Sequence, residues 1–116
     1  MTLADERCAS YRADDAPLSM TEASELARNV PQWTLSEQKI EREFKFKDFR
    51  HAIAFVSQVA VAAEDQKHHP DILISYNRVR LTLSTHKVGG LTRNDFILAA
   101  QIDPLAENVT ASATRQ

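Results

Sequence analysis

Three histidines are the residues of this sequence best suited to acid-base chemistry. His68 and His69 are adjacent and precede Pro70, and His86 lies further along the chain. Imidazole titrates nearer neutrality than any other side chain, so it can both give and take a proton at physiological pH. We therefore take these histidines as candidate catalytic residues. Adjacent histidines in a surface loop are also often simply solvated, and the local sequence leaves that alternative open.

The same three histidines could be imagined as nitrogen ligands of a metal ion. Adjacent residues in an extended chain project to opposite sides, so His68 and His69 would not readily share one ion. Downstream there is no second close-set pair of Cys, His or carboxylate residues. We therefore expect no metal site, and acid-base chemistry at the histidines requires no cofactor.

Other polar residues near the histidines have structural interpretations of their own. Tyr76 fits a half-buried strand aromatic that packs against neighbours. Asp95 fits the third helical position of a capping box that begins at Thr92. His86 ends an alternating run in which Leu81 and Leu83 face the core, so it should point away from the core. That placement suits either a pocket wall or plain exposure.

The spacing of apolar residues predicts the elements that position these side chains. Apolar residues recur every three or four positions over about 49–65, which predicts a long helix capped by Asp48. A shorter helix from about Ser19 should stop before Pro31. Alternating runs over 33–46 and 72–86 predict two hairpins, and a last helix should open at Thr92.

This element order, α-β-β-α-β-β-α, predicts an α+β fold in which helices cover one face of a four-stranded antiparallel sheet. The length of 116 residues fits one domain, 1–116. Residues 1–18 lack periodicity and should form either a loosely ordered leader or an arm draped over the domain. Residues 107–116 should form a frayed polar tail.

Bulk properties exclude several classes of partner. The net charge is -2, which offers no electrostatic attraction to nucleic acid or to an anionic membrane surface. No apolar run approaches the roughly 20 residues of a membrane-spanning helix. The start of the chain lacks the basic-then-apolar pattern of a signal peptide, and the single cysteine, Cys8, cannot form an intramolecular disulfide. We therefore expect a cytoplasmic protein.

Several positions of the sequence share one frame with a known family. Glu64, His68-His69-Pro70, Tyr76, His86 and Asp95 together resemble the signature of the pterin-4a-carbinolamine dehydratases, bacterial type included. The stretch 76–86 is similar to that family's second hairpin, and 90–96 to the start of its last helix. The resemblance extends over about residues 19–105.

The resemblance implies a lyase that removes water from 4a-hydroxytetrahydropterin and so recycles the pterin of aromatic amino-acid hydroxylases. Expelling the hydroxyl group needs one proton donor and one acceptor, which two imidazoles can supply. The family pattern assigns these roles to His68 and His86, and mainly substrate binding to His69. It also places five residues around the substrate: Glu64, Pro70, Tyr76, Thr85 and Asp95.

The resemblance carries further implications and one departure. It implies a homodimer or homotetramer, and an aromatic amino-acid hydroxylase is a further partner that it suggests. Some relatives act instead as a dimerisation cofactor or regulator, or as an assembly chaperone without the His-His-Pro triplet that this chain keeps. Ile72 stands where many relatives have an aromatic residue, so stacking on the pterin must be weaker or come from elsewhere.

Overall fold

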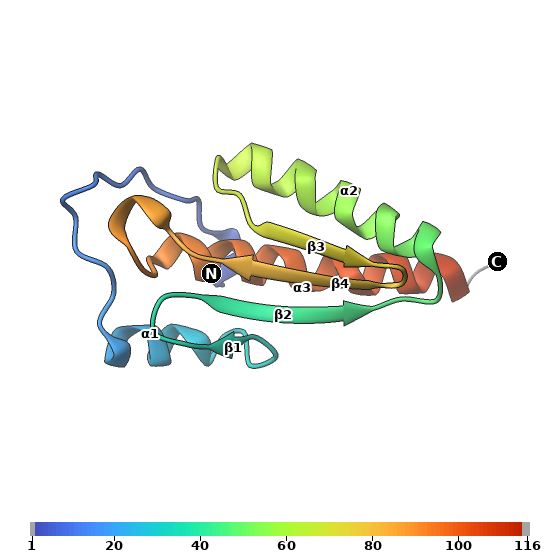
Figure 1. Cartoon of the computed structure of the whole chain (residues 1–116), viewed down its shortest axis with the longest axis horizontal. Helices are drawn as coiled ribbons and strands as arrows, with labels where there is room; N and C mark the ends of the chain where they lie inside the picture. Colours follow the sequence, from blue (N-terminus) through green and yellow to red (C-terminus); the bar gives the residue numbers. More distant parts are fainter. Residues whose placement is uncertain (1, 115–116) are drawn as a thin grey trace.

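The chain folds as a four-stranded antiparallel sheet covered on one face by helices. The computed structural model describes residues 2–114, and side chains as far as Val109. The strands β1 (Thr34–Leu35), β2 (Ile40–Lys45), β3 (Asp71–Ser75) and β4 (Arg78–Leu83) lie in the order β1-β2-β4-β3. Figure 1 shows α3 (Arg93–Thr114) passing behind the sheet, with α2 (Phe49–Gln66) alongside it. The predicted fold class is confirmed.

The alternation of apolar residues in the central strands builds the core. Ile40 pairs with Leu83 and Phe44 with Val79 in the β2–β4 ladder, and all four side chains are buried. The ring of Phe55 in α2 lies 4.7 Å from that of Phe44, so the helix covers this face of the sheet. Burying each such side chain contributes roughly 1.5–3 kcal/mol.

The helices begin where side-chain caps are available. Asp48 accepts a hydrogen bond from the His51 amide at the start of α2, as predicted. Ser19 and Glu22 form a capping box at the start of α1 (Met20–Ala27). Each cap pairs amide groups that the first helical turn cannot satisfy internally, which stabilises a helix by about 1 kcal/mol.

The last helix is longer than predicted. It continues past Pro104 and through the expected polar tail as far as Thr114, while residues 115 and 116 lie outside the described part. A proline inside a helix removes one backbone hydrogen bond. Val109, five residues further along the helix, is only 4% exposed, so burial offsets part of that cost. Its burial explains why the helix does not end near Glu107.

Residues 2–18 form an arm that packs along the domain. Leu3, in the short helix η1 (Leu3–Asp5), is buried against the core. The Gln101 side chain of α3 donates to the carbonyls of Ala4 and Glu6 at 3.1 and 3.2 Å. Of the two alternatives for this segment, these contacts fit the arm draped over the domain. None of the helices in the described part is long and apolar enough to cross a membrane.

Candidate active site

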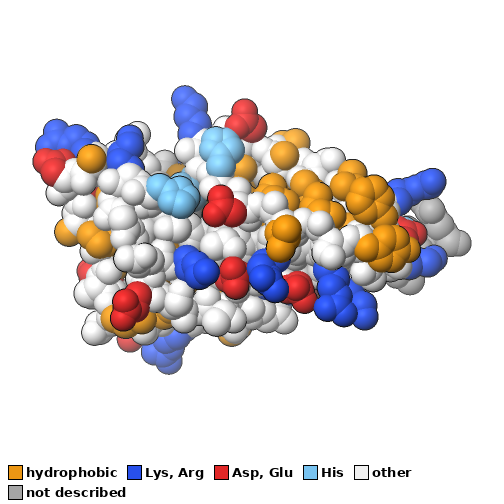
Figure 2. Space-filling view, in the orientation of Figure 1, with side chains coloured by type: hydrophobic (Ala, Val, Ile, Leu, Met, Phe, Trp, Pro, Cys, Tyr) orange, Lys and Arg blue, Asp and Glu red, His pale blue; other side chains and the backbone are white. Residues whose placement is uncertain are grey.

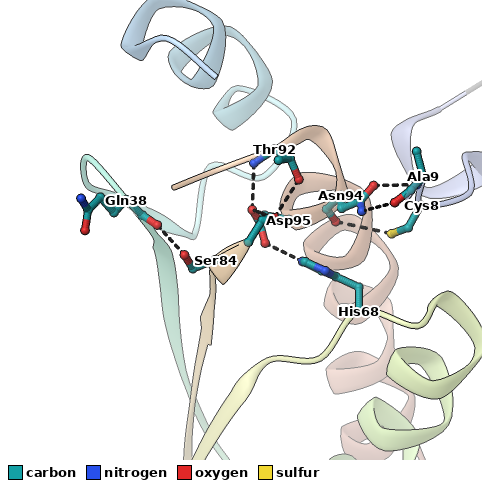
Figure 3. Close-up of polar contacts among 9 residues, drawn as sticks. Cys8, Ala9, Gln38, His68, Ser84, Thr92, Asn94 and Asp95 are labelled. Atoms are coloured by element: carbon teal, nitrogen blue, oxygen red, sulfur yellow. Dashed lines mark hydrogen bonds and ion pairs between the residues drawn. The ribbon is translucent and has the colours of Figure 1, made fainter. Parts of the chain in front are cut away.

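The end of α2 turns the chain so that His68 faces α3. Lys67 adopts a left-handed conformation with φ 54°, and the His68 amide donates to the Ala63 carbonyl at 3.1 Å. This hydrogen bond closes the last turn of the helix in the way that C-terminal capping motifs usually do. The His68 side chain is 11% exposed, and its Nε2 lies 2.6 Å from Oδ1 of Asp95 (Figure 3).

Asp95 is completely buried and fully hydrogen-bonded. Its Oδ2 accepts from the Thr92 amide at 3.0 Å and from the Thr85 hydroxyl at 2.9 Å. Since Thr85 has a single hydroxyl proton, the 2.8 Å contact between its Oγ1 and that of Thr92 requires Thr92 to donate. Asp95 therefore has two roles: Oδ2 caps the start of α3, as predicted, and Oδ1 contacts His68.

This arrangement selects one tautomer of His68. A carboxylate only accepts hydrogen bonds, so the Nε2 atom that faces Asp95 carries the proton. The other ring nitrogen, Nδ1, then carries the lone pair, and no hydrogen bond to it comes from the residues that the structure describes. A histidine oriented in this way by a buried carboxylate is the arrangement that makes imidazole an effective general base.

His69 has a carboxylate partner of a different kind. Its Nε2 lies 2.5 Å from Oε2 of Glu64, but the two side chains are 60% and 77% exposed. Solvent competes for both groups, so the pair is weak and contributes about 0–1 kcal/mol. His69 and Glu64 therefore lie near His68 without sharing its environment.

His86 does not lie on a strand, so the side-chain alternation used to orient it does not apply. β4 ends at Leu83, and an isolated bridge between Thr85 and Gly90 closes a tight loop that begins the short helix η2 (His86–Val88). His86 is exposed, and its ring makes no hydrogen bond within the described part of the chain. The loop nevertheless places it at the same cavity as His68.

One cavity joins the three histidines. Its volume is about 360 Å³, the lower end of the range for small-molecule sites. The walls come from the arm, the end of α2 and the segment from Ser84 to η2. The lining residues are Cys8, Ala9, Ser10, Tyr11, Gln66, Lys67, His68, His69, Ser84, Thr85, His86, Lys87 and Asn94.

Of the five predicted substrate-binding residues, only Thr85 lines this cavity. Glu64 and Asp95 lie behind it as the partners of His69 and His68, and Pro70 and Tyr76 lie apart from it. Tyr76 follows β3 at the end of the strand away from the histidines, has φ 53° and is 66% exposed. It lines a separate depression with Lys47 and His51. Pro70 only links His69 to β3. The expected packing of Tyr76 as a half-buried strand residue is therefore wrong, because the residue occupies a tight turn whose left-handed backbone projects it into solvent.

No sequence pattern pointed to the arm residues of the cavity. Cys8 is half-buried, and its thiol lies 3.7 Å from the Asn94 carbonyl. Burial, and to a lesser extent the nearby Asp95 charge, raises the pKa of this thiol from 9.0 to about 11. Cys8 is therefore an unreactive thiol at neutral pH, because thiolate is the nucleophilic form. Among the described residues no cluster of three or more His, Cys, Asp or Glu could hold a metal.

Comparison with known proteins agrees with this geometry. The family model described as pterin 4 alpha carbinolamine dehydratase matches residues 16–105. A relative from Rubrobacter xylanophilus whose name gives this family is 41% identical over 89% of this chain and 97% of its own. Another, from Chloroflexus aurantiacus, is 52% identical over 76% and 95%. The chain belongs to the pterin-4a-carbinolamine dehydratase family.

Two solved structures share the fold. The transcriptional coactivator/pterin dehydratase from Brucella melitensis is 38% identical, with a TM-score of 0.74 over 78% of this chain and 98% of its own. A pterin dehydratase-like protein identified as a RuBisCO assembly factor in the alpha-carboxysome is 17% identical, with a TM-score of 0.54 over 84% and 96%. The second likeness shows the fold alone.

Proposed function

We propose that the protein is a hydro-lyase that converts 4a-hydroxytetrahydropterin into quinonoid dihydropterin and water. The observation that carries this proposal is His68, held by buried Asp95 and sharing one cavity with His86. The family of the chain supplies the substrate class. The reaction would recycle, in the cytoplasm, the pterin used by an aromatic amino-acid hydroxylase.

The reaction needs one proton to leave the substrate and one to enter it. The bond between C4a and the hydroxyl oxygen breaks, the ring nitrogen N5 loses its proton, and the departing oxygen gains one to leave as water. We assign the acceptor role to Nδ1 of His68, whose lone pair Asp95 leaves free. His86 would protonate the leaving group, and its exposure lets it exchange protons with solvent afterwards. Each transfer is typically worth about 100- to 10,000-fold in rate.

The decisive test is single-turnover dehydration of synthetic 4a-hydroxytetrahydropterin, with the uncatalysed rate subtracted. His68→Ala and His86→Ala should each lower turnover by about 100-fold or more. The double variant should lose less than the product of the two, because groups that act in one step are not additive. EDTA should leave wild-type turnover unchanged.

Near wild-type rates in both single variants would overturn the acid-base assignment. They would favour the non-enzymatic alternative, in which the fold serves as a dimerisation cofactor, regulator or assembly chaperone. Loss of activity in EDTA that zinc restores would contradict the metal-free mechanism.

We also propose that the protein is a homo-oligomer that covers an apolar surface on α2 and β3. Figure 2 shows hydrophobic side chains gathered at the end of the molecule away from the pale blue histidines. β3 is an edge strand, and an unpaired edge next to exposed apolar residues favours association. The exposed residues are Phe49, Ile53, Ile72, Leu73 and Tyr76.

Sedimentation tests this surface. Wild-type protein should be a dimer or tetramer at micromolar concentration, and Leu73→Glu should shift it toward monomer, because a charge would be buried without a partner. Leu73 is 58% exposed in the single chain, so the substitution should not disturb the fold. A wild-type monomer would contradict the proposal.

A further inference from the structure

Two buried amide side chains of the domain form hydrogen bonds with the backbone of the arm. Asn94 accepts from the Ala9 amide at 2.8 Å and donates to the Ala9 carbonyl at 2.7 Å, as Figure 3 shows. Gln66 accepts from the Cys8 amide at 2.8 Å. Asn94 and Gln66 are 5% and 8% exposed, so without the arm their polar atoms would need other partners. The domain is therefore built to hold residues 8 and 9 in place.

Ion pairs also join the arm to α3 and to α2. Arg93 makes two hydrogen bonds to Glu6, at 2.7 and 2.6 Å, and Arg7 donates to the carboxylate and the carbonyl of Asp65 at 3.1 and 3.0 Å. Bidentate arginine contacts constrain direction as well as distance. The arm is thus tied to the first turn of α3 and the last turn of α2, the two elements that carry Asp95 and lead into His68.

These contacts position an aromatic ring at the cavity. Tyr11 lies two residues after Ala9, is partly buried and lines the cavity that contains His68 and His86. Among the described residues that line it, Tyr11 alone carries a benzene ring. Tyr11 also lies outside residues 16–105, the range matched by the family model.

We propose that Tyr11 is a substrate-positioning residue whose ring packs against the flat heterocycle bound beside His68. This inference rests on the proposed dehydratase function and adds the arm to its binding site. Aromatic rings prefer offset or edge contacts with other rings, and such a contact is worth about 2- to 10-fold in affinity. Asn94 acts through Tyr11, because it fixes the backbone that carries the ring.

Binding and turnover together test the role of Tyr11. The probe is 7,8-dihydropterin, which has no 4a-hydroxyl group to lose, titrated against the full chain by protein fluorescence. Tyr11→Ala should weaken its binding by about 3- to 10-fold and raise KM for dehydration by a similar factor. The value of kcat should fall less than twofold. Tyr11→Phe should recover most of the lost affinity.

We call the two hydrogen bonds between Asn94 and Ala9 the clamp, and a double-mutant cycle tests whether it acts through Tyr11. Asn94→Ala should raise KM in wild-type protein but have little further effect in Tyr11→Ala, because both changes remove the same contact. Additive effects would show that Asn94 acts independently of Tyr11 and would overturn the clamp. Thermal melts of each variant would separate a binding defect from loss of fold.

The outcomes also separate this inference from the proposed function. Wild-type protein that neither binds the probe nor dehydrates the substrate would overturn both. Wild-type protein that does both, with Tyr11→Ala equal to it in affinity and KM, would overturn the role of Tyr11 alone and leave the dehydratase proposal intact.

Discussion

The chain contains two neighbouring histidine-carboxylate pairs that differ in environment. His68 meets Asp95 at 2.6 Å with the two side chains 11% and 0% exposed. His69 meets Glu64 at 2.5 Å with both side chains more than half exposed. The two distances are nearly equal, so distance alone does not distinguish the pairs. Burial does, because a charged group removed from water interacts far more strongly with its partner.

The carboxylates also differ in how they are held. Asp95 accepts hydrogen bonds from Thr85 and Thr92 on its second oxygen, which locks its position relative to His68. No hydrogen bond besides that to His69 holds the Glu64 side chain within the described part of the chain. A fixed acceptor can select one tautomer of its histidine, whereas a mobile one in water cannot. We therefore infer that Asp95 orients His68 as a catalytic base, whereas the exposed pair of His69 and Glu64 contacts the substrate.

The matched variants Asp95→Asn and Glu64→Gln should give the largest contrast. Each replaces a carboxylate by an amide of the same shape. In Asp95→Asn the amide oxygen can keep its bonds to Thr85 and Thr92, but its NH2 group then faces His68 and reverses the tautomer. We expect turnover to fall by about 100-fold or more while the fold survives.

Glu64→Gln should lower turnover by less than about fivefold, which corresponds to the worth of an exposed pair. Single-turnover rates and thermal melts on both variants make the comparison. Equal losses in the two would mean that burial does not set the roles of the two carboxylates.

Alanine substitutions of the histidines should give a smaller contrast, in folding stability. His68→Ala leaves Oδ1 of buried Asp95 without a protein partner, which should cost about 1–3 kcal/mol. This cost exceeds that of replacing a solvated surface histidine, because His68 and Asp95 are both buried. His69→Ala should change stability by less than about 0.5 kcal/mol.

Kinetics should separate the same two variants. His69→Ala should raise KM more than it lowers kcat, since its proposed role is to hold the pterin. Denaturant titration and steady-state kinetics check the pair of predictions. A destabilisation of His69→Ala as large as that of His68→Ala would contradict the difference drawn from their exposure.

Local sequence signals predicted the parts of this site that depend on neighbours along the chain. The period of apolar residues located α2, and Asp48 marked its start. The capping position of Asp95 was visible in the same way. The family resemblance placed His68 and Asp95 at one site, but their contact, which joins residues 27 apart, was not predicted.

The features that were missed depend on backbone contacts between distant segments. Ala9 is held by Asn94 through main-chain atoms, and the two residues are 85 apart, so no periodicity in the arm reveals it. His86 was assigned to a strand because the alternation of β4 was extended past Leu83. The chain instead turns there, since Gly89 adopts φ 73° and lets Gly90 bridge back to Thr85. A pair of glycines after the histidine was the available signal.

The smallest expected effect concerns Cys8 and reports whether Asp95 carries its charge. Burial is the main cause of the raised pKa of this thiol, about 11, and the negative charge of Asp95 is the second. A negative neighbour disfavours thiolate and raises the pKa, so its removal must lower the pKa. Asp95→Asn should therefore move the pH midpoint of Cys8 alkylation downward, by less than burial has raised it.

Glu64→Gln is the matched control, because Glu64 is exposed and is not among the causes of the raised pKa of Cys8. The rate of reaction with iodoacetamide, followed from neutral pH to about one unit above the wild-type midpoint, gives both midpoints, since only thiolate reacts. A downward shift in Asp95→Asn alone would show a charged carboxylate beside His68 that solvent does not screen. An unchanged midpoint would mean that Asp95 is protonated or screened, and the tautomer assigned to His68 would lose its basis.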